Sequence, residues 1–174
     1  MNLTVNPKLT CVQVDDVSYA TTNFTNVDDA TVFSKDCFPL PSIAIPDTNF
    51  EQALIDLGFD TNGLNGTITQ EDADLVTSLT IGNADNNENL PNVSSKISDL
   101  TGIESFTNLK SLNCILNNIT NLDLSNNLQL TALNADKNNL VSLNVANGNN
   151  TKFTTFNAEN NADLNCIQVD NQQY

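Results

Sequence analysis

The sequence predicts a repeat solenoid, a β-rich right-handed coil with a small helical cap at its N-terminal end. Leucines and asparagines between residues 109 and 150 recur at an interval of 21 residues. A segment with helical patterning precedes them, at residues 45–76. The start of the chain also has a near copy at its far end, since LTCVQVDDVSY (9–19) returns as LNCIQVDNQQY (164–174). Such self-similarity is the sequence signature of a stacked repeat.

The repeat follows the pattern LxxLxLxxNxL. The first full copy occupies Leu109, Leu112, Cys114, Asn117 and Ile119. The second copy lies 21 residues later, at Leu130, Leu133, Ala135, Asn138 and Leu140. After an insertion near residue 148 come Phe153, Phe156, Ala158 and Asn161. Half-repeats begin at residues 119 and 140, and one coil cannot bury its apolar face alone, so we expect the coils to stack.

Asparagine is unusually abundant, with 31 of the 174 residues. Four of these follow the strand positions, where the chain must turn: Asn117, Asn127, Asn138 and Asn161. A side-chain amide can donate to and accept from the backbone of adjacent coils. A buried polar group without a partner costs about 1–3 kcal/mol, so the sequence predicts a continuous ladder of asparagines that serves the scaffold.

The charge balance excludes several classes of function. Six lysines face 21 acidic residues, and the formal net charge is -15. Such a chain repels nucleic acid and anionic lipid, and no apolar run approaches the roughly 20 residues of a membrane helix. The chain has no histidine, so the usual pairs of nucleophile and base are absent and we expect no enzyme activity. The acidic surface either serves solubility or attracts cations, calcium above all.

Residues 46–74 are expected to form the helical cap. Thr48-x-x-Glu51 reads as a capping box, an apolar stripe follows it, and Gly58 stands where a helix would stop. A second short helix is predicted over residues 68–76, with Thr69 as its N-cap. An end coil exposes its apolar core, so some cap is physically required.

Together, these patterns resemble the leucine-rich repeat family, in the short form of about 21 residues found in cell-surface and secreted proteins of Bacteroidetes. The resemblance implies a cap over residues 46–74 and leucine-rich repeats over 75–170. Residues 1–38 would be the closing segment of a preceding repeat unit. The Pro-rich residues 39–45 would be a linker, and 171–174 the truncated start of another closing segment. The resemblance also implies a Cys11–Cys37 disulfide and a bacterial, extracellular or cell-surface protein. Cys114 is expected to be a buried thiol, and Cys166 is left over.

Two groups of residues are candidate sites. Asp60 and Asn62 could begin a calcium loop, with Glu71 or Asp72 as its last ligand, but Gly66 comes one position late for an EF-hand, and a plain turn is the alternative. The outward strand positions are small and polar, and we expect the binding surface to include Lys110, Asn113, Thr131, Asn134, Thr155 and Asn157.

The predicted function is a non-catalytic extracellular recognition or adhesion module that binds a protein or a glycan through the solenoid surface. We expect it to need no cofactor, although calcium could bind to it, and to neither bind nucleic acid nor insert into a membrane. The alternative is a structural building block of a tandem array, a stalk or a head-to-tail fibre formed by self-association. The insertion at residues 82–96 could be a lateral binding loop or slack.

Overall fold

The computed structural model describes residues 9, 11–28, 31–34 and 42–170. Its contacts divide the chain into two compact units, Met1–Leu40 and Pro41–Tyr174. The predicted closing segment lies in the first unit, and the predicted cap and repeats lie in the second. Each unit is described by itself.

In the N-terminal unit, one pair of parallel strands is separated by a helix. Strand β1 (Cys11–Gln13) pairs with β2 (Val32–Ser34), and Cys11 stands opposite Val32. Helix α1 (Val17–Asn23) lies between them in the chain, and the Asp16 side chain caps it by accepting a hydrogen bond from the backbone N–H of Tyr19. Paired residues in β1 and β2 are therefore 21 residues apart, the same interval as in the repeats.

The segment predicted as the cap, which together with residues 42–45 we call the cap below, contains two helices and a small antiparallel sheet. Helix α2 spans Thr48–Asp56 and α3 spans Gln70–Leu75, while β3 (Ser42–Ala44) pairs with β4 (Thr67–Thr69). The linker predicted over 39–45 is therefore too long, because residues 42–44 belong to the cap sheet. Thr69 caps α3 as predicted, by accepting from the backbone N–H of Asp72.

The predicted capping box of α2 is wrong. Asp47 is the N-cap, and its Oδ1 accepts from the backbone N–H groups of Asn49 and Phe50 at 2.9 and 3.1 Å. Glu51 does not reach back to the helix start, because its Oε1 accepts from the loop at residues 65–67. Tertiary contacts, rather than the local pattern, decide the role of both carboxylates.

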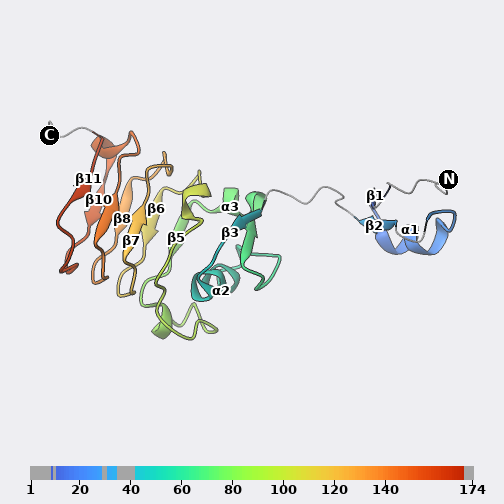
Figure 1. The fold of residues 1–174 in the computed structure, drawn as a ribbon, viewed down its shortest axis with the longest axis horizontal. Helices are drawn as coiled ribbons and strands as arrows, with labels where there is room; N and C mark the ends of the chain where they lie inside the picture. The colour runs from blue at the N-terminus through green and yellow to red at the C-terminus, as the bar shows by residue number, and fades with distance from the viewer. Residues whose placement is uncertain (1–8, 10, 29–30, 35–41, 171–174) are drawn as a thin grey trace. The chain divides into compact units, whose positions relative to one another are not determined.

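Two parallel sheets form the solenoid, one on each side of the coil. The first sheet has the order β10-β8-β6-β5, with bounds Thr155–Asn157, Ala132–Asn134, Ser111–Asn113 and Ser78–Thr80. The second has the order β11-β9-β7, with bounds Ile167–Gln168, Ser142–Asn144 and Asn121–Asp123. Short 3-10 helices span Ala84–Asn86, Ile103–Ser105 and Asn150–Lys152. The strands follow one another away from the cap, from β5 to β11 (Figure 1). This is a repeat solenoid, and the handedness of its coil stays a prediction.

The strand register places equivalent leucines on top of one another. Leu79, Leu112 and Leu133 are opposite each other in the first sheet, and all are buried. Cys114 and Ala135, two residues after Leu112 and Leu133, are also buried. Burial raises the pKa of the Cys114 thiol to about 12, so it remains protonated and inert at neutral pH.

The insertion at residues 82–96 packs against the cap and is not slack. It lengthens the step from β5 to β6 to 33 residues, as the pairing of Ser78 with Ser111 shows. Leu90 and Val93 are buried in the common core. Asn92 donates its backbone N–H and its side-chain amide to the carboxylate of Asp56 at 2.9 and 2.7 Å. The insertion thereby fastens the cap helix to the first coil.

Candidate functional site

The first sheet presents two rows of small side chains on its outer face, and all but Ala132 are polar. Strands β5, β6 and β8 bury the central residue and expose the residues on either side, at least in part, whereas the central Phe156 of β10 is 43% exposed. The residue pairing aligns one row as Thr80, Asn113, Asn134 and Asn157. The other row is Ser78, Ser111, Ala132 and Thr155. Adjacent strands lie about 4.8 Å apart, so each row repeats at that spacing. We call the eight residues the outer strip.

The three asparagines of the outer strip have a fixed orientation. Their Oδ1 atoms accept the backbone N–H of the second residue ahead: Asn113 from Ile115, Asn134 from Asp136 and Asn157 from Glu159, at 3.3, 3.3 and 3.0 Å. This turn holds the side chain in place and ends the strand. Within the described residues, none of the three Nδ2 groups donates to a protein atom. The ends of β6, β8 and β10 therefore each present an oriented amide whose N–H groups are available to donate to a ligand.

The other predicted surface residues lie beside this row. Lys110 is exposed immediately before β6, and Thr155 is exposed in β10. Thr131 precedes β8, and its hydroxyl donates to the carbonyl of Lys110 at 3.4 Å, so it is partly engaged with the backbone. All six predicted residues therefore lie in a strand of the first sheet or directly before one. Ser78 and Thr80 extend the strip to β5, which the repeat alignment left out because the insertion separates it from the others.

The asparagines Asn117, Asn138 and Asn161 are buried and connect successive coils. The Asn138 amide donates to the carbonyls of Cys114 in the preceding coil and Ala135 in its own, at 2.9 and 3.2 Å. Its Oδ1 accepts from the backbone N–H of Ile119 at 3.1 Å. Asn117 and Asn161 make the same three kinds of bond. These side chains hold the scaffold and are not accessible to a ligand.

Asn127 lies in a second row, on the side of the β7–β9 sheet. Its amide donates to the carbonyls of Ile103 and Phe106 at 2.8 and 3.1 Å. The sequence analysis missed the next member, Asn147, which is buried and donates to the carbonyl of Asn127 at 3.1 Å. The repeat interval could have identified Asn147, because it follows Asn127 by 20 residues, which is about one repeat.

The residues of the predicted calcium loop are only partly brought together. Asp60 is buried, and its Oδ1 accepts from the backbone N–H of Asn62 at 3.0 Å. Glu71 is exposed on α3, whereas the neighbouring Asp72 is buried and accepts from the hydroxyl of Thr61 at 2.9 Å. The structure adds Glu51 from α2, which the sequence analysis assigned to a helix cap. Among the described residues, no three His, Cys, Asp or Glu side chains converge as a metal site.

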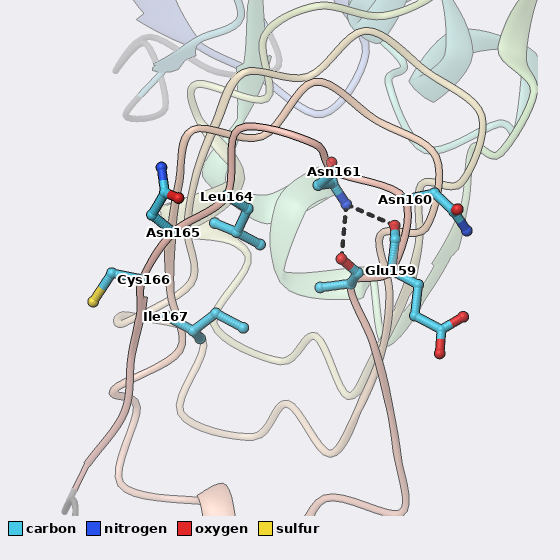
Figure 2. A pocket seen from close by; sticks show the side chains of 8 residues that line it. Glu159, Asn160, Asn161, Leu164, Asn165, Cys166 and Ile167 are labelled. Atoms are coloured by element: carbon cyan, nitrogen blue, oxygen red, sulfur yellow. Dashed lines mark hydrogen bonds between the residues drawn. The ribbon is translucent and has the colours of Figure 1, made fainter.

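Of the predicted disulfide, one half can be described. Cys11 is disulfide-bonded, whereas Cys37 lies outside the described residues, so the pairing of the two stays a prediction. Cys166 is a free, exposed cysteine. It borders an open hollow in the last described coil that also includes Ala158, Asn161, Leu164 and Ile167. Figure 2 shows the Asn161 amide bonded to the carbonyls of residues 158 and 159, so its donors are engaged with the backbone.

Among the helices of the described residues, none has the length and apolar character required to cross a membrane.

Comparison with known proteins yields structural likeness only. Neither a protein-family model nor a curated protein matches the chain. The functional domain of InlJ from Listeria monocytogenes, which includes a cysteine ladder, is similar over 77% of this chain and 34% of its own, with 26% identity and a TM-score of 0.49. An internalin (InlF) of Listeria monocytogenes is similar over 72% of this chain and 36% of its own, with 23% identity and a TM-score of 0.47. The CBM51-2 and INT domains of Clostridium perfringens ZmpB, in complex with GlcNAc, are similar over 65% of this chain and 22% of their own, with 28% identity and a TM-score of 0.42. The chain thus spans about a third or less of each of these proteins, and likeness at this level carries no conclusion about function.

Proposed function

We propose that this chain is a non-catalytic, extracellular recognition or adhesion module that binds a protein or a glycan through the outer strip. The observation that carries the proposal is the row of oriented amide groups at Asn113, Asn134 and Asn157. Each oxygen is held by its own turn, and each Nδ2 is left to donate elsewhere. Donors fixed before binding lose little conformational entropy when a ligand arrives.

The chemistry of the strip favours a hydroxyl-rich or carbonyl-rich ligand. Apart from Ala132, its side chains are amides and hydroxyls at regular spacing, which suits the hydroxyl groups of a neutral glycan or the exposed backbone of a protein. The net charge of -15 opposes an anionic ligand. The chain has no tryptophan, so contacts of moderate affinity repeated along the strip suit it better than one aromatic hot spot.

A binding array tests the proposal with a substitution that removes only the donors. In the double variant Asn113→Asp and Asn134→Asp, a carboxylate oxygen still accepts the backbone N–H of the turn, but the Nδ2 donors are gone. We expect neutral glycans or proteins that bind the unmodified chain to lose about tenfold or more in affinity, because two direct hydrogen bonds are lost.

The matched control is Asn118→Asp with Asn139→Asp. Both asparagines are exposed in turns away from the outer strip, and the control adds the same two negative charges. Equal loss of binding in the two double variants would reduce the effect to charge and contradict the proposal. Unchanged affinity of the Asn113→Asp and Asn134→Asp double variant would also contradict the proposal.

A second candidate function is a structural one, a block that associates head to tail. It is favoured by the strand pair of the N-terminal unit, in which Cys11 and Val32 stand one 21-residue repeat apart. Strand β1 (Cys11–Gln13) also corresponds in sequence to residues 166–168, which include β11 at the far end of the solenoid. A coil of this kind on one molecule therefore has the pattern needed to continue the solenoid of another. Light scattering at increasing concentration should then show a growing mass, and a strict monomer at millimolar concentration would contradict this function.

A further inference from the structure

Three carboxylates are buried inside the cap, which is an unusual concentration of negative charge. Glu51 comes from α2, Asp60 from the loop that follows, and Asp72 from α3, and their exposed fractions are 1%, 5% and 7%. Buried carboxylates are ordinarily paired with a cation or fully hydrogen-bonded. The salt bridge found among the described residues joins Lys137 to Asp136, in the repeats, and does not serve this cluster.

One oxygen of each carboxylate holds the same loop, residues 60–67. Glu51 Oε1 accepts from the backbone N–H groups of Asn65, Gly66 and Thr67, at 2.7, 2.6 and 3.1 Å. Asp60 Oδ1 accepts from residue 62 at 3.0 Å, and Asp72 Oδ2 accepts from the backbone N–H of residue 61 at 3.3 Å. The three acidic groups therefore all bind backbone N–H groups of one short loop.

The second oxygens of Glu51 and Asp60 have no partner. Glu51 Oε2 and Asp60 Oδ2 are both buried, and neither has a hydrogen-bond donor. Burial raises the pKa of Asp60, and the nearby charges of Glu51 and Asp72 raise it further, so these groups are within electrostatic reach of one another. Two desolvated carboxylate oxygens in one cap are costly unless a positive charge or a proton compensates them.

We propose that Glu51 Oε2 and Asp60 Oδ2 bind one divalent cation of the calcium class, which ties α2 to the loop at residues 60–67. Calcium takes six to eight oxygen ligands in flexible geometry and accepts backbone carbonyls, amide oxygens and water beside carboxylates. The two carboxylate oxygens are ligands of this kind, and water and backbone carbonyls would complete the coordination shell. A third acidic ligand is not needed, and Glu71 takes no part.

Thermal unfolding in EDTA and in about 5 mM CaCl2, both with 150 mM NaCl, tests this site. Extracellular calcium modules have dissociation constants of about 0.1–1 mM, so this concentration occupies the site. We expect calcium to raise the Tm by about 2–6 °C at pH 7.5. Calorimetric titration should also show one calcium ion that the variants below do not bind.

The variants separate a bound cation from a shared proton. Asp60→Asn keeps the acceptor for residue 62 and Glu51→Gln keeps the acceptor for the loop, while each removes the negative charge from the unpartnered position. Either variant should abolish the calcium-dependent rise in Tm, and Asp60→Asn should raise the Tm in EDTA. Asp85→Asn removes an exposed carboxylate outside the cap and should leave the calcium response unchanged.

Two outcomes would overturn the proposal. In the first, calcium leaves the Tm of the unmodified protein unchanged while Asp60→Asn still stabilises it, which would assign the buried oxygens to a shared proton. In the second, calcium stabilises the unmodified protein and both charge-removing variants equally, which would place the ion elsewhere on the acidic surface.

Discussion

At the scale of single residues, side-chain amides decide how the coils hold together. Asn138 satisfies two carbonyls and one backbone N–H that the stacked strands leave without a partner. These groups are buried, so no water can replace the amide without rearrangement. The repeat pattern could predict such positions because a fixed interval brings the same turn to the same place in each coil.

Substitution of Asn138 tests the value of this bonding. Asn138→Ala should lower the free energy of unfolding by about 2 kcal/mol, because it leaves the buried N–H of Ile119 without an acceptor and removes one of two donors from the carbonyls of Cys114 and Ala135. Asn139→Ala, at the adjacent exposed position, should stay within about 0.5 kcal/mol of the unmodified protein. Urea unfolding measures both, and an equal effect of the two substitutions would show that the buried row contributes nothing specific.

Other residue roles could not be predicted, because the sequence pattern does not contain their cause. Leu116, Lys137 and Asn160 all adopt left-handed backbone with φ of 58°, 54° and 53°, directly before the buried asparagines. Leucine and lysine rarely adopt this conformation, so the residue type gives no warning. The turn geometry of the repeat imposes it. The role of Glu51 is also not visible in the local sequence, because its hydrogen-bond partners lie in the loop at residues 65–67.

At the scale of elements, the cap is attached to the solenoid through the N-terminus of α2. Asp47 Oδ1 caps this helix, and Oδ2 accepts from the backbone N–H groups of Ser98 and Asp99 at 2.8 and 3.0 Å. Burial raises the pKa of Asp47, but the hydrogen bonds from Ser98, Phe50 and Asp99 outweigh it, and the pKa is lowered from 3.8. One carboxylate thus joins a helix to the first coil.

The pH dependence of stability tests this connection. Because the pKa of Asp47 is lower in the folded state, its contribution is complete above about pH 4 and is lost as the pH falls through the folded value. At pH 7, Asp47→Ala should cost about 2 kcal/mol for the cap and the bonds to the first coil. The difference from the unmodified protein should shrink below pH 4 in urea unfolding.

The control for this prediction is Asp85→Ala, which removes an exposed carboxylate and should change stability little at any pH. A constant cost of Asp47→Ala from pH 7 to pH 2.5 would mean that ionisation of Asp47 does not support the connection.

The elements themselves were predicted where periodicity is strong and misjudged where tertiary contacts intervene. Strands β6 and β8 follow directly from the repeat. The sequence predicts a Pro-rich linker where β3 lies, because its three residues carry no recognisable alternation and form a strand through pairing with β4. The insertion at residues 82–96 looked like a loop by composition, yet Leu90 and Val93 anchor it in the core.

At the scale of the whole molecule, the solenoid turns a short polar motif into a long surface. Each coil adds one oriented amide at the end of a strand, and the register lines these groups up across β6, β8 and β10. The outward residues of this strip could be predicted from strand alternation alone. The fixed orientation of the asparagines could not, because it depends on the turn that follows each strand.

The most direct test of the recognition surface is the response of the side-chain amide signals of a 15N-labelled sample to a ligand identified by the array. We predict that the NH2 resonances of Asn113, Asn134 and Asn157 shift on titration, while those of the buried Asn117 and Asn138 stay in place. Shifts confined to the insertion at residues 82–96 or to the cap, with the outer strip unchanged, would contradict the account.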